Sequence, residues 1–194
     1  YASSMGDGVI QYKNGTPVQS YNEKNAFKET AGGYGSGYCY IDGLAFDKNG
    51  NLWMTSSEVN HAVLVLDKAG AWHRLDIEQL RGVYTINDIL ITSTNDKWIY
   101  VPRNTPKLVM IPNSESLDEV SSYEFTTLID TDGKELTPSN YTCVAEDKDG
   151  YIWVGTNRGA VYFTKPRISS AEDKAATRCT RVKYTNEETG NLAI

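Results

Sequence analysis

The segment "EDKDGYIWVGT", residues 146–156, combines two patterns that predict different structures. Asp147, Asp149 and Gly150 have the look of a calcium-binding loop, whereas Gly150 followed by "YIWVGT" is typical of a tight turn that leads into a strand. An EF-hand loop that begins at Asp147 requires glycine at position 6 and glutamate at position 12, but here glycine is at position 4 and Arg158 at position 12. We therefore interpret the segment as a turn between two strands.

Two further segments carry the same turn pattern. Residues 40–57, "YIDGLAFDKNGNLWMTSS", share the block Asp-Lys-x-Gly-x-x-Trp with residues 141–157, and residues 86–103 form a degenerate copy. The tryptophans of the three copies lie 45 and 55 residues apart. Because propeller blades repeat about every 40–50 residues, this period predicts an all-β fold, a β-propeller. The three tryptophans are expected to fill the core between neighbouring blades. The structural residues of the repeat are Asp47, Gly50, Trp53, Trp98, Asp147, Gly150 and Trp153.

The alternation of apolar and polar residues predicts four-stranded antiparallel blades, in which residues 122–130 and 177–184 form the outermost strands of the second and third units. Three complete units follow three strands that match the last three of another unit, which gives fifteen strands or about 3.75 blades. Two interpretations stay open: a segment of a larger propeller, which we favour, and a four-bladed ring closed by the tail at 186–194. Open blade edges in a segment would allow self-association. The units cover about residues 1–22, 40–76, 86–130 and 141–184 of a single domain, 1–194.

The composition argues against several classes of function. The net charge is −6 and the sequence has no basic stripe, so nucleic acid is not an expected partner. No apolar run approaches the roughly 20 residues of a membrane span, and no membrane insertion is expected. Cys39, Cys143 and Cys179 lack CxxC spacing and allow at most one disulfide. The first residue is not methionine, so we expect a processed or cut N-terminus.

The segment "YTCVAEDKDGYIWVGTNRGAVYF", residues 141–163, resembles a two-component regulator propeller repeat. Units of that family read as a strand, then Asp-x-x-Gly-x-x-Trp-x-Gly-Thr, then a strand that starts with glycine and ends in an aromatic residue. Residues 40–57 keep the aspartate, glycine and tryptophan but have Ser-Ser in place of Gly-Thr, and residues 86–103 keep little beyond the tryptophan. The matching residues of the third unit are Asp147, Gly150, Trp153, Gly155, Thr156, Gly159 and Phe163.

The resemblance implies a larger propeller, commonly of seven blades, in the periplasm or at the surface of Gram-negative bacteria. Two settings are typical: the sensor ectodomain of hybrid two-component histidine kinases that detect polysaccharide fragments, and PorZ-like proteins of the type IX secretion system. The long insertion at 164–194 resembles the PorZ-like pattern. The implied function is non-catalytic binding of a saccharide or of a peptide or protein ligand. A structural docking propeller in a secretion assembly is the alternative.

Catalysis has little support in the sequence. Residues 43–67 also resemble NHL and gluconolactonase-type repeats, so a metal-dependent lactonase- or lyase-like enzyme is a third hypothesis. Such sites take ligands from several blades, but His61 and His73, the two histidines, fall in one unit. No nucleophile elbow, phosphate loop or H-E-x-x-H motif is present. We therefore predict no catalytic residue, no bound metal and no cofactor.

Strand direction alternates within a blade, so the short turns between first and second strands lie on one face, the turn face. Longer loops lie on the opposite face, the loop face. Because function concentrates on long loops held by a rigid scaffold, we predict a binding site on the loop face. Its loops span 22–39, 77–85 and 131–140 between blades, and 57–60, 103–106 and 157–159 within them.

Tyrosines form the first set of candidate ligand contacts on the loop face. Tyr34, Tyr38 and Tyr40 interleave with glycines in "AGGYGSGYCY", residues 31–40. Their rings suit stacking on a sugar or a peptide, because they are flat, amphipathic and have few rotamers. The structural interpretation is a glycine-rich connection in which the tyrosines are incidental.

Two equivalent pairs of polar residues complete the candidates. Arg103 and Arg158 each follow a repeat tryptophan by five residues and could hold a carboxylate in bidentate fashion. Asp42 and Asn87 each precede a repeat tryptophan by eleven residues, near the start of the innermost strand, where they could bind sugar hydroxyls. Solvated loop charges and strand-end caps are the corresponding structural interpretations.

Overall fold

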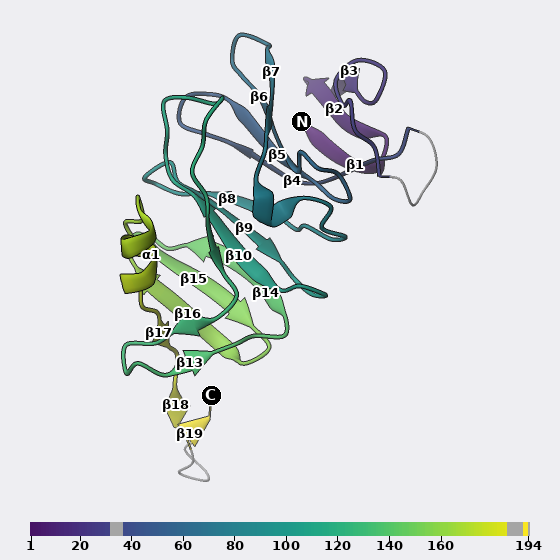
Figure 1. Ribbon diagram of the computed structural model, residues 1–194. Coiled ribbons are helices and arrows are strands. Elements are labelled where there is room, and N and C mark those ends of the chain that lie inside the picture. Colours follow the sequence, from purple (N-terminus) through teal and green to yellow (C-terminus); the bar gives the residue numbers. More distant parts are fainter. Residues whose placement is uncertain (32–36, 186–191, 194) are drawn as a thin grey trace.

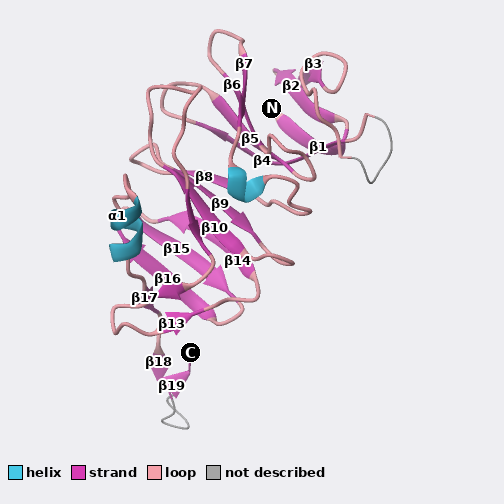
Figure 2. Cartoon of the chain, viewed as in Figure 1, coloured by secondary structure: helices cyan, strands magenta, loops and turns pink. Residues whose placement is uncertain are grey.

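The computed structural model describes residues 1–31, 37–185 and 192–193. In these residues the chain consists almost entirely of antiparallel strands, with one α-helix, α1 (Ala171–Ala176), and one 3-10 turn, Glu78–Leu80. Successive sheets follow one another from the N-terminal strands to the C-terminal ones, so the two termini lie at opposite ends of the molecule (Figure 1). Figure 2 shows how little of the chain is helical.

Each of the three repeat units contributes four consecutive antiparallel strands, as predicted. Those of the second and third units form separate four-stranded sheets, and those of the first belong to a seven-stranded sheet. The central strands have four to six residues, as the alternation pattern indicated. The first unit consists of β4 (Cys39–Phe46), β5 (Leu52–Ser56), β6 (Val63–Leu66) and β7 (Trp72–Leu75). The second consists of β8 (Ile89–Ile91), β9 (Lys97–Val101), β10 (Lys107–Ile111) and β11 (Tyr123–Phe125). The third consists of β14 (Tyr141–Glu146), β15 (Tyr151–Thr156), β16 (Gly159–Thr164) and β17 (Thr180–Arg181).

Three N-terminal strands precede these units and join the first of them. The strands are β1 (Ala2–Gly6), β2 (Gly8–Lys13) and β3 (Thr16–Tyr21). The end of β1 pairs with the start of β4, where Gly6 lies opposite Cys39. A similar contact links the second and third units, because Tyr141 N donates to the Pro102 carbonyl at 3.0 Å. Relative to β4, β1 therefore takes the place of a blade's second strand.

The outermost strands depart from the prediction. The run 122–130 was expected to form one strand, but only β11 pairs with β10, while β12 (Leu128–Ile129) turns to pair with β13 (Glu135–Leu136). The cause is a local turn in which Asp130 Oδ1 accepts from Asp132 N and Lys134 N at 3.0 and 2.8 Å. The last predicted strand, 177–184, is reduced to β17, and α1 precedes it. The remaining strands are β18 (Tyr184–Thr185) and β19 (Leu192–Ala193).

The repeated turn uses both carboxylate oxygens of its aspartate. Asp47 Oδ1 accepts hydrogen bonds from the backbone N–H groups of Asn49 and Asn51, each at 2.9 Å. Asp47 Oδ2 accepts from the Trp53 indole Nε1 at 2.9 Å. The side chain therefore closes the turn and also fixes the tryptophan of the following strand, as aspartates of such turns do.

The turn of the third unit repeats this arrangement. Asp147 accepts from two backbone N–H groups through Oδ1 and from the Trp153 indole Nε1 through Oδ2, the last at 2.8 Å. Gly50 and Gly150 adopt φ angles of 84° and 80°, which a residue with a Cβ adopts only at a cost. Because the carboxylate is engaged within the protein, the interpretation of residues 146–156 as a turn is confirmed.

Tryptophans fill the core between blades at two of the three expected places. Trp53 and Trp98 are each 1% exposed. The Lys97 ammonium of the second unit lies 4.4 Å from the Trp53 ring centroid. Trp98 in turn packs against Phe125 and Phe163, with centroid separations of 5.9 and 5.5 Å. Each tryptophan thus joins its own blade to the next.

Trp153 differs, and the expectation that it is buried is wrong. Its side chain is 36% exposed and packs on Tyr162 of its own sheet at 4.9 Å between centroids. The two buried counterparts are covered by the blade that follows them. Among the described residues no four-stranded sheet follows the third one, so the face that carries Trp153 is left open.

Candidate functional site

The candidate residues near the start of the innermost strands come together in the structure. Tyr38 immediately precedes β4, which contains Tyr40 and Asp42, and Asn87 immediately precedes the neighbouring β8 region. Tyr34 lies outside the described residues. We call Tyr38, Tyr40, Asp42, Asn87 and Tyr100 the loop-face cluster.

Asp42 is half-buried and weakly hydrogen-bonded. Ser57 Oγ lies 3.4 Å from Asp42 Oδ2, and the same hydroxyl accepts from Ile86 N at 2.8 Å, which brings the residue before Asn87 alongside. Burial raises the pKa of Asp42 to about 6; the Ser57 hydroxyl opposes the shift and the nearby Asp88 carboxylate adds to it. A carboxylate held in this way retains acceptor capacity for a ligand.

Asn87 connects the innermost strands of two blades. Its side-chain amide donates to the Tyr100 hydroxyl at 3.1 Å, and that hydroxyl donates to the Thr142 carbonyl at 3.2 Å. The Thr55 hydroxyl of the preceding blade donates to the Asn87 carbonyl at 3.0 Å. Tyr100 was not among the predicted candidates. It lies two residues after Trp98, on the same face of the strand, and belongs to the same core cluster.

The two described tyrosines of the glycine-rich segment contact each other edge-to-face. The ring centroids of Tyr38 and Tyr40 are 6.3 Å apart and the planes meet at 88°. A Cβ placed on Gly6 would come within 3.2 Å of the Tyr38 ring, so the glycine allows the ring to lie close to β1. Burial raises the pKa of Tyr40, and the charge of Asp42 adds to the shift. Both rings are thus held by neighbouring strands.

The two candidate arginines stand apart from the cluster. Arg103 and Arg158 are exposed, in the β9–β10 and β15–β16 loops. Neither guanidinium makes an ion pair with a described residue. The structure therefore joins Tyr38 to Tyr40 by a ring contact and Asn87 to Tyr100 by a hydrogen bond, and leaves the arginines as separate loop charges. Their ligand role stays a prediction.

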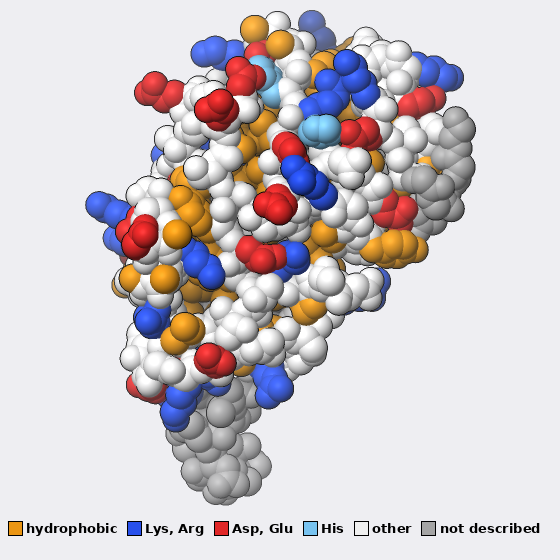
Figure 3. All heavy atoms as spheres, viewed as in Figure 1, with side chains coloured by type: hydrophobic (Ala, Val, Ile, Leu, Met, Phe, Trp, Pro, Cys, Tyr) orange, Lys and Arg blue, Asp and Glu red, His pale blue; other side chains and the backbone are white. Residues whose placement is uncertain are grey.

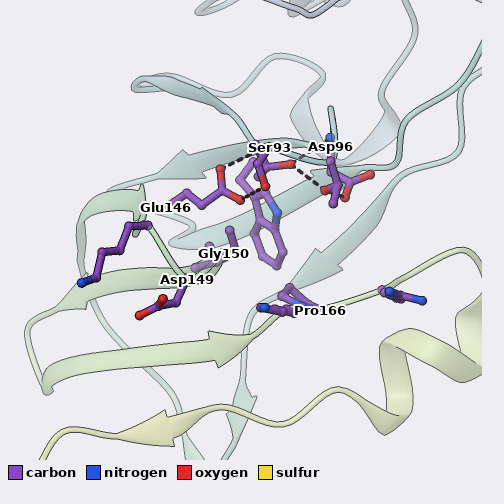
Figure 4. Close-up of a pocket in the computed structure, with 13 residues that line it drawn as sticks. Ser93, Asp96, Glu146, Asp149, Gly150 and Pro166 are labelled. Atoms are coloured by element: carbon purple, nitrogen blue, oxygen red, sulfur yellow. Dashed lines mark hydrogen bonds between the residues drawn. The ribbon is translucent and has the colours of Figure 1, made fainter.

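A pocket lined by polar groups lies on the turn face, which the sequence did not single out. A pocket of about 300 Å³ separates the turn of the second unit, residues 92–96, from residues 146–150 and 165–167 of the third. Glu146 bridges its rim, because its carboxylate accepts from the backbone N–H and the hydroxyl of Ser93 at 2.5 and 2.6 Å (Figure 4).

Other features bear on the classes of function. Basic and acidic side chains are interspersed on the face shown in Figure 3, without a basic stripe. Within residues 1–31, 37–185 and 192–193, no three metal-ligating side chains cluster and no helix is long and apolar enough to cross a membrane. Cys39, Cys143 and Cys179 are all free thiols, the first and last of them buried.

Comparison with known proteins identifies the repeat and the fold. Residues 135–158 match the model of the family described as two component regulator propeller. PorZ of Porphyromonas gingivalis, an essential surface component of its type-IX secretion system, matches 98% of this chain and 26% of its own length, with 17% identity and a TM-score of 0.82. No curated protein matches the chain.

Two further solved structures share the architecture less closely. The extracellular domain of a protein assigned as a hybrid two component system of B. thetaiotaomicron covers 94% of this chain and 23% of its own, with 16% identity and a TM-score of 0.55. A streptogramin B lyase covers 77% and 42%, with 15% identity and a TM-score of 0.51. The chain thus spans about a quarter of the first two proteins. The match over residues 135–158 and the four-stranded blades together show that the chain is similar to two component regulator propellers.

Proposed function

We propose that the chain is a non-catalytic propeller unit that binds a saccharide at the loop-face cluster. The observation that supports the proposal is the edge-to-face pair of Tyr38 and Tyr40 at the start of the strand that carries the half-buried Asp42. The Ser57 hydroxyl next to Asp42 also accepts from the backbone N–H of the residue before Asn87. Sugars offer apolar ring faces to aromatic side chains and hydroxyl groups to carboxylates and amides. The side chains of the loop-face cluster can make both kinds of contact. A peptide would use the same tyrosines and is an outcome of the test.

The placement of the histidines supports a binding role over a catalytic one. His61 Nδ1 contacts the Glu29 carboxylate, and His73 Nε2 lies 3.1 Å from Asp67 Oδ2. Both pairs belong to the outer part of the first blade, away from the innermost strands where a propeller enzyme assembles its ligands. Each imidazole is thus held by a neighbouring carboxylate on the periphery.

The setting that we propose is outside the cytoplasm. Two of the similar structures are a bacterial surface component and an extracellular domain of a two component system. We therefore propose a periplasmic or cell-surface location. Any signalling output or secretion role would belong to a longer protein of which this chain is a segment. The fold similarity supports this setting without specifying the ligand.

The test is a glycan array on the purified chain, followed by calorimetry with the hit. We expect Tyr40→Ala and Asp42→Asn each to weaken binding at least tenfold. Tyr12→Ala is the matched control, because Tyr12 is an exposed tyrosine of β2, and its binding should be unchanged. Arg103→Gln and Arg158→Gln show whether the loop arginines reach the ligand. A hit that tolerates both cluster variants, or peptide hits without any glycan, would contradict the proposal.

The open face of the third blade favours a second candidate function, docking against another propeller blade. Trp153, Tyr162 and Tyr151 form an aromatic row on that face, and Tyr151 stacks on Tyr162 with planes 6° apart. The counterparts of Trp153 are buried by a following blade, so the face has the chemistry of a blade–blade contact. Light scattering on the purified chain tests association, which Trp153→Ser should reduce; a monomer at all concentrations argues against pairing of two copies.

A further inference from the structure

The tryptophan of the second unit lacks the hydrogen-bond partner that its two counterparts have. Trp53 and Trp153 donate their indole N–H to Asp47 and Asp147, six residues before them. The equivalent residue before Trp98 is Thr92. Among the described residues, no hydrogen bond from the Trp98 indole N–H is found. The Trp98 side chain is only 1% exposed and lines the pocket on the turn face, and its N–H is not one of the fully buried polar atoms without a partner, so this N–H is open to the pocket.

Thr92 makes one of the two kinds of hydrogen bond that the aspartate makes in the other turns, the one to the backbone. Its hydroxyl oxygen accepts from the Asp96 backbone N–H at 3.0 Å, as Asp47 Oδ1 accepts from Asn51 N in the first unit. The turn is therefore preserved. A threonine has no second oxygen to offer, so the place that a carboxylate oxygen occupies in the other two turns is vacant here.

The place of this missing carboxylate oxygen lies at the pocket on the turn face. Trp98 lines the pocket together with Thr92 and the rest of the 92–96 turn. An indole N–H at the wall of a pocket without a protein acceptor is normally satisfied by water or by a ligand. The cavity thus stands where an acceptor is missing, and its volume of about 300 Å³ admits a ligand larger than a carboxylate group.

The charges around the pocket favour an anionic acceptor. Lys148, Lys165 and Arg167 line it, and none of the three makes an ion pair or a side-chain hydrogen bond with a described residue. Two carboxylates of the lining are already engaged, Glu146 with Ser93 and Asp96 with the Asn113 backbone N–H at 2.8 Å.

The third carboxylate of the lining, Asp149, is exposed and points away from the 92–96 turn (Figure 4). The cationic side chains of the lining can therefore pair with a ligand, whereas most of its carboxylates already accept hydrogen bonds from the protein. Pro166 and Ile152 provide apolar contact area beside them. A neighbouring hollow of about 270 Å³ shares Lys165, Pro166 and Arg167 and adds Arg178, so the cationic groove continues beneath α1.

We propose that this pocket binds a carboxylate-bearing ligand, whose carboxylate takes the place of the missing aspartate and accepts the Trp98 indole N–H. Lys165 and Arg167 pair with the ligand charge, and Ile152 and Pro166 contact its carbon skeleton. The site is on the opposite face from the loop-face cluster and does not depend on it. Uronic acids and acidic amino-acid side chains share this chemistry.

Indole N–H resonances offer a direct test, because the chain has four tryptophans. In ¹H–¹⁵N spectra of the ¹⁵N-labelled chain, glucuronate or glutarate should shift the Trp98 indole signal, assigned with Trp98→Phe, and leave the Trp53 signal in place. Glucose should shift neither signal. A response to glucuronate alone assigns an acidic sugar, and a response to both acids assigns a general carboxylate site. No response to either acid overturns the proposal.

Thr92→Asp is the decisive variant, because it supplies the missing internal acceptor. It should abolish the response to both acids and move the free Trp98 indole signal toward that of Trp153, whose N–H already meets a carboxylate. Unchanged acid binding in this variant contradicts the proposal. Should Thr92→Asp fail to fold, as judged by circular dichroism, Arg167→Gln provides a second test with an expected loss of affinity of at least fivefold.

Arg103→Gln is the matched control for charge, since Arg103 is an exposed arginine outside the pocket. It should leave the Trp98 response unchanged. Equal losses in the Arg167 and Arg103 variants would show a non-specific charge effect and overturn the assignment. Because a neutral glycan at the loop-face cluster has no reason to shift the Trp98 signal, failure of this proposal and failure of the proposed function are distinguishable.

Discussion

Residues 47–53 and 147–153 adopt the same turn in two different environments. In both, the aspartate accepts two backbone N–H groups and the tryptophan indole, with indole distances of 2.9 and 2.8 Å. Yet Trp53 is 1% exposed and Trp153 36% exposed. The comparison teaches that the turn is a local structure that forms without burial, whereas the burial of its tryptophan depends on the adjacent blade.

The largest expected contrast is between Trp53→Ala and Trp153→Ala. Removing a buried tryptophan costs about 3–5 kcal/mol of unfolding free energy, so Trp53→Ala should come close to unfolding the chain. Trp153→Ala loses mainly its contact with Tyr162 and should cost about 1 kcal/mol. Urea denaturation followed by circular dichroism measures both. Equal losses would show that the Trp153 face is covered in solution and would break the comparison.

A smaller contrast is expected between Asp47→Ala and Asp147→Ala. The first leaves the Trp53 N–H without an acceptor in the core, for which about 1–3 kcal/mol is expected beyond the lost turn contacts. In the second, water can reach the Trp153 N–H, so only the turn contacts are lost. Denaturation midpoints of the two alanine variants provide the measurement, and Asp→Asn at each site is the control that keeps one acceptor oxygen. A larger loss at position 147 would contradict the role given to burial.

Gly50→Ala and Gly150→Ala should have equal effects, because the strain is local. Both glycines have a left-handed φ, and the nearest atoms to an added Cβ lie 3.8 and 3.6 Å away, at ordinary contact distance. Each substitution should cost about 1 kcal/mol through backbone conformation alone. Gly70→Ala is the control, with φ 91° and open space around it. Unequal losses at 50 and 150 would mean that the neighbouring blade also shapes the turn.

The smallest differences are expected between the pKa values of Asp47 and Asp147. Burial raises the pKa of Asp47, but hydrogen bonds from Trp53 and from backbone N–H groups outweigh it and leave the pKa below the ordinary value. For Asp147 the hydrogen bond from Trp153 is the leading cause of a lowered pKa. Because both folded pKa values lie below the unfolded ones, each turn is stabilised above the unfolded pKa of 3.8, and this stabilisation is lost as the pH falls through the folded pKa.

Carboxyl ¹³C NMR measures these pKa values directly. Asp42 provides the opposite case in the same spectrum, with an expected midpoint of about 6. Because its folded pKa lies above the unfolded one, its ionisation reduces stability as the pH rises from about 4 to about 6. Midpoints of Asp47 and Asp147 above that of an ordinary aspartate would contradict the hydrogen-bonding scheme of the turn.

Much of the fold follows from local sequence patterns. The spacing of Asp-x-x-Gly-x-x-Trp placed the turns, and alternation on either side placed the strands of the three blades in the right order. The exposure of Trp153 could not be predicted, because it depends on a neighbouring sheet. The split of 122–130 was missed because the Asp130 turn competes with the expected outer strand.

The candidate sites divide in a similar way. The equivalence of Asp42 and Asn87 was visible from their spacing to the tryptophans, but the contact of Tyr100 with Asn87 depends on how the strands of the second unit pack. The pocket on the turn face was missed although its signal is present in the sequence. Thr92 in the aspartate position becomes informative only once the Asp47–Trp53 hydrogen bond is known.

The buried Lys97 of the second blade affects which repeats can pack beside each other. Lys97 is 1% exposed over the Trp53 ring, and burial lowers its pKa while the charges of Asp47 and Asp96 oppose the shift. The residues at this position in the other two units are apolar, Leu52 and Ile152. Repeats with nearly the same backbone risk pairing with the wrong neighbour as they fold. A buried lysine that is stabilised by the Trp53 ring and the Asp47 charge therefore favours packing of the second blade against the first and disfavours its packing against the other repeats.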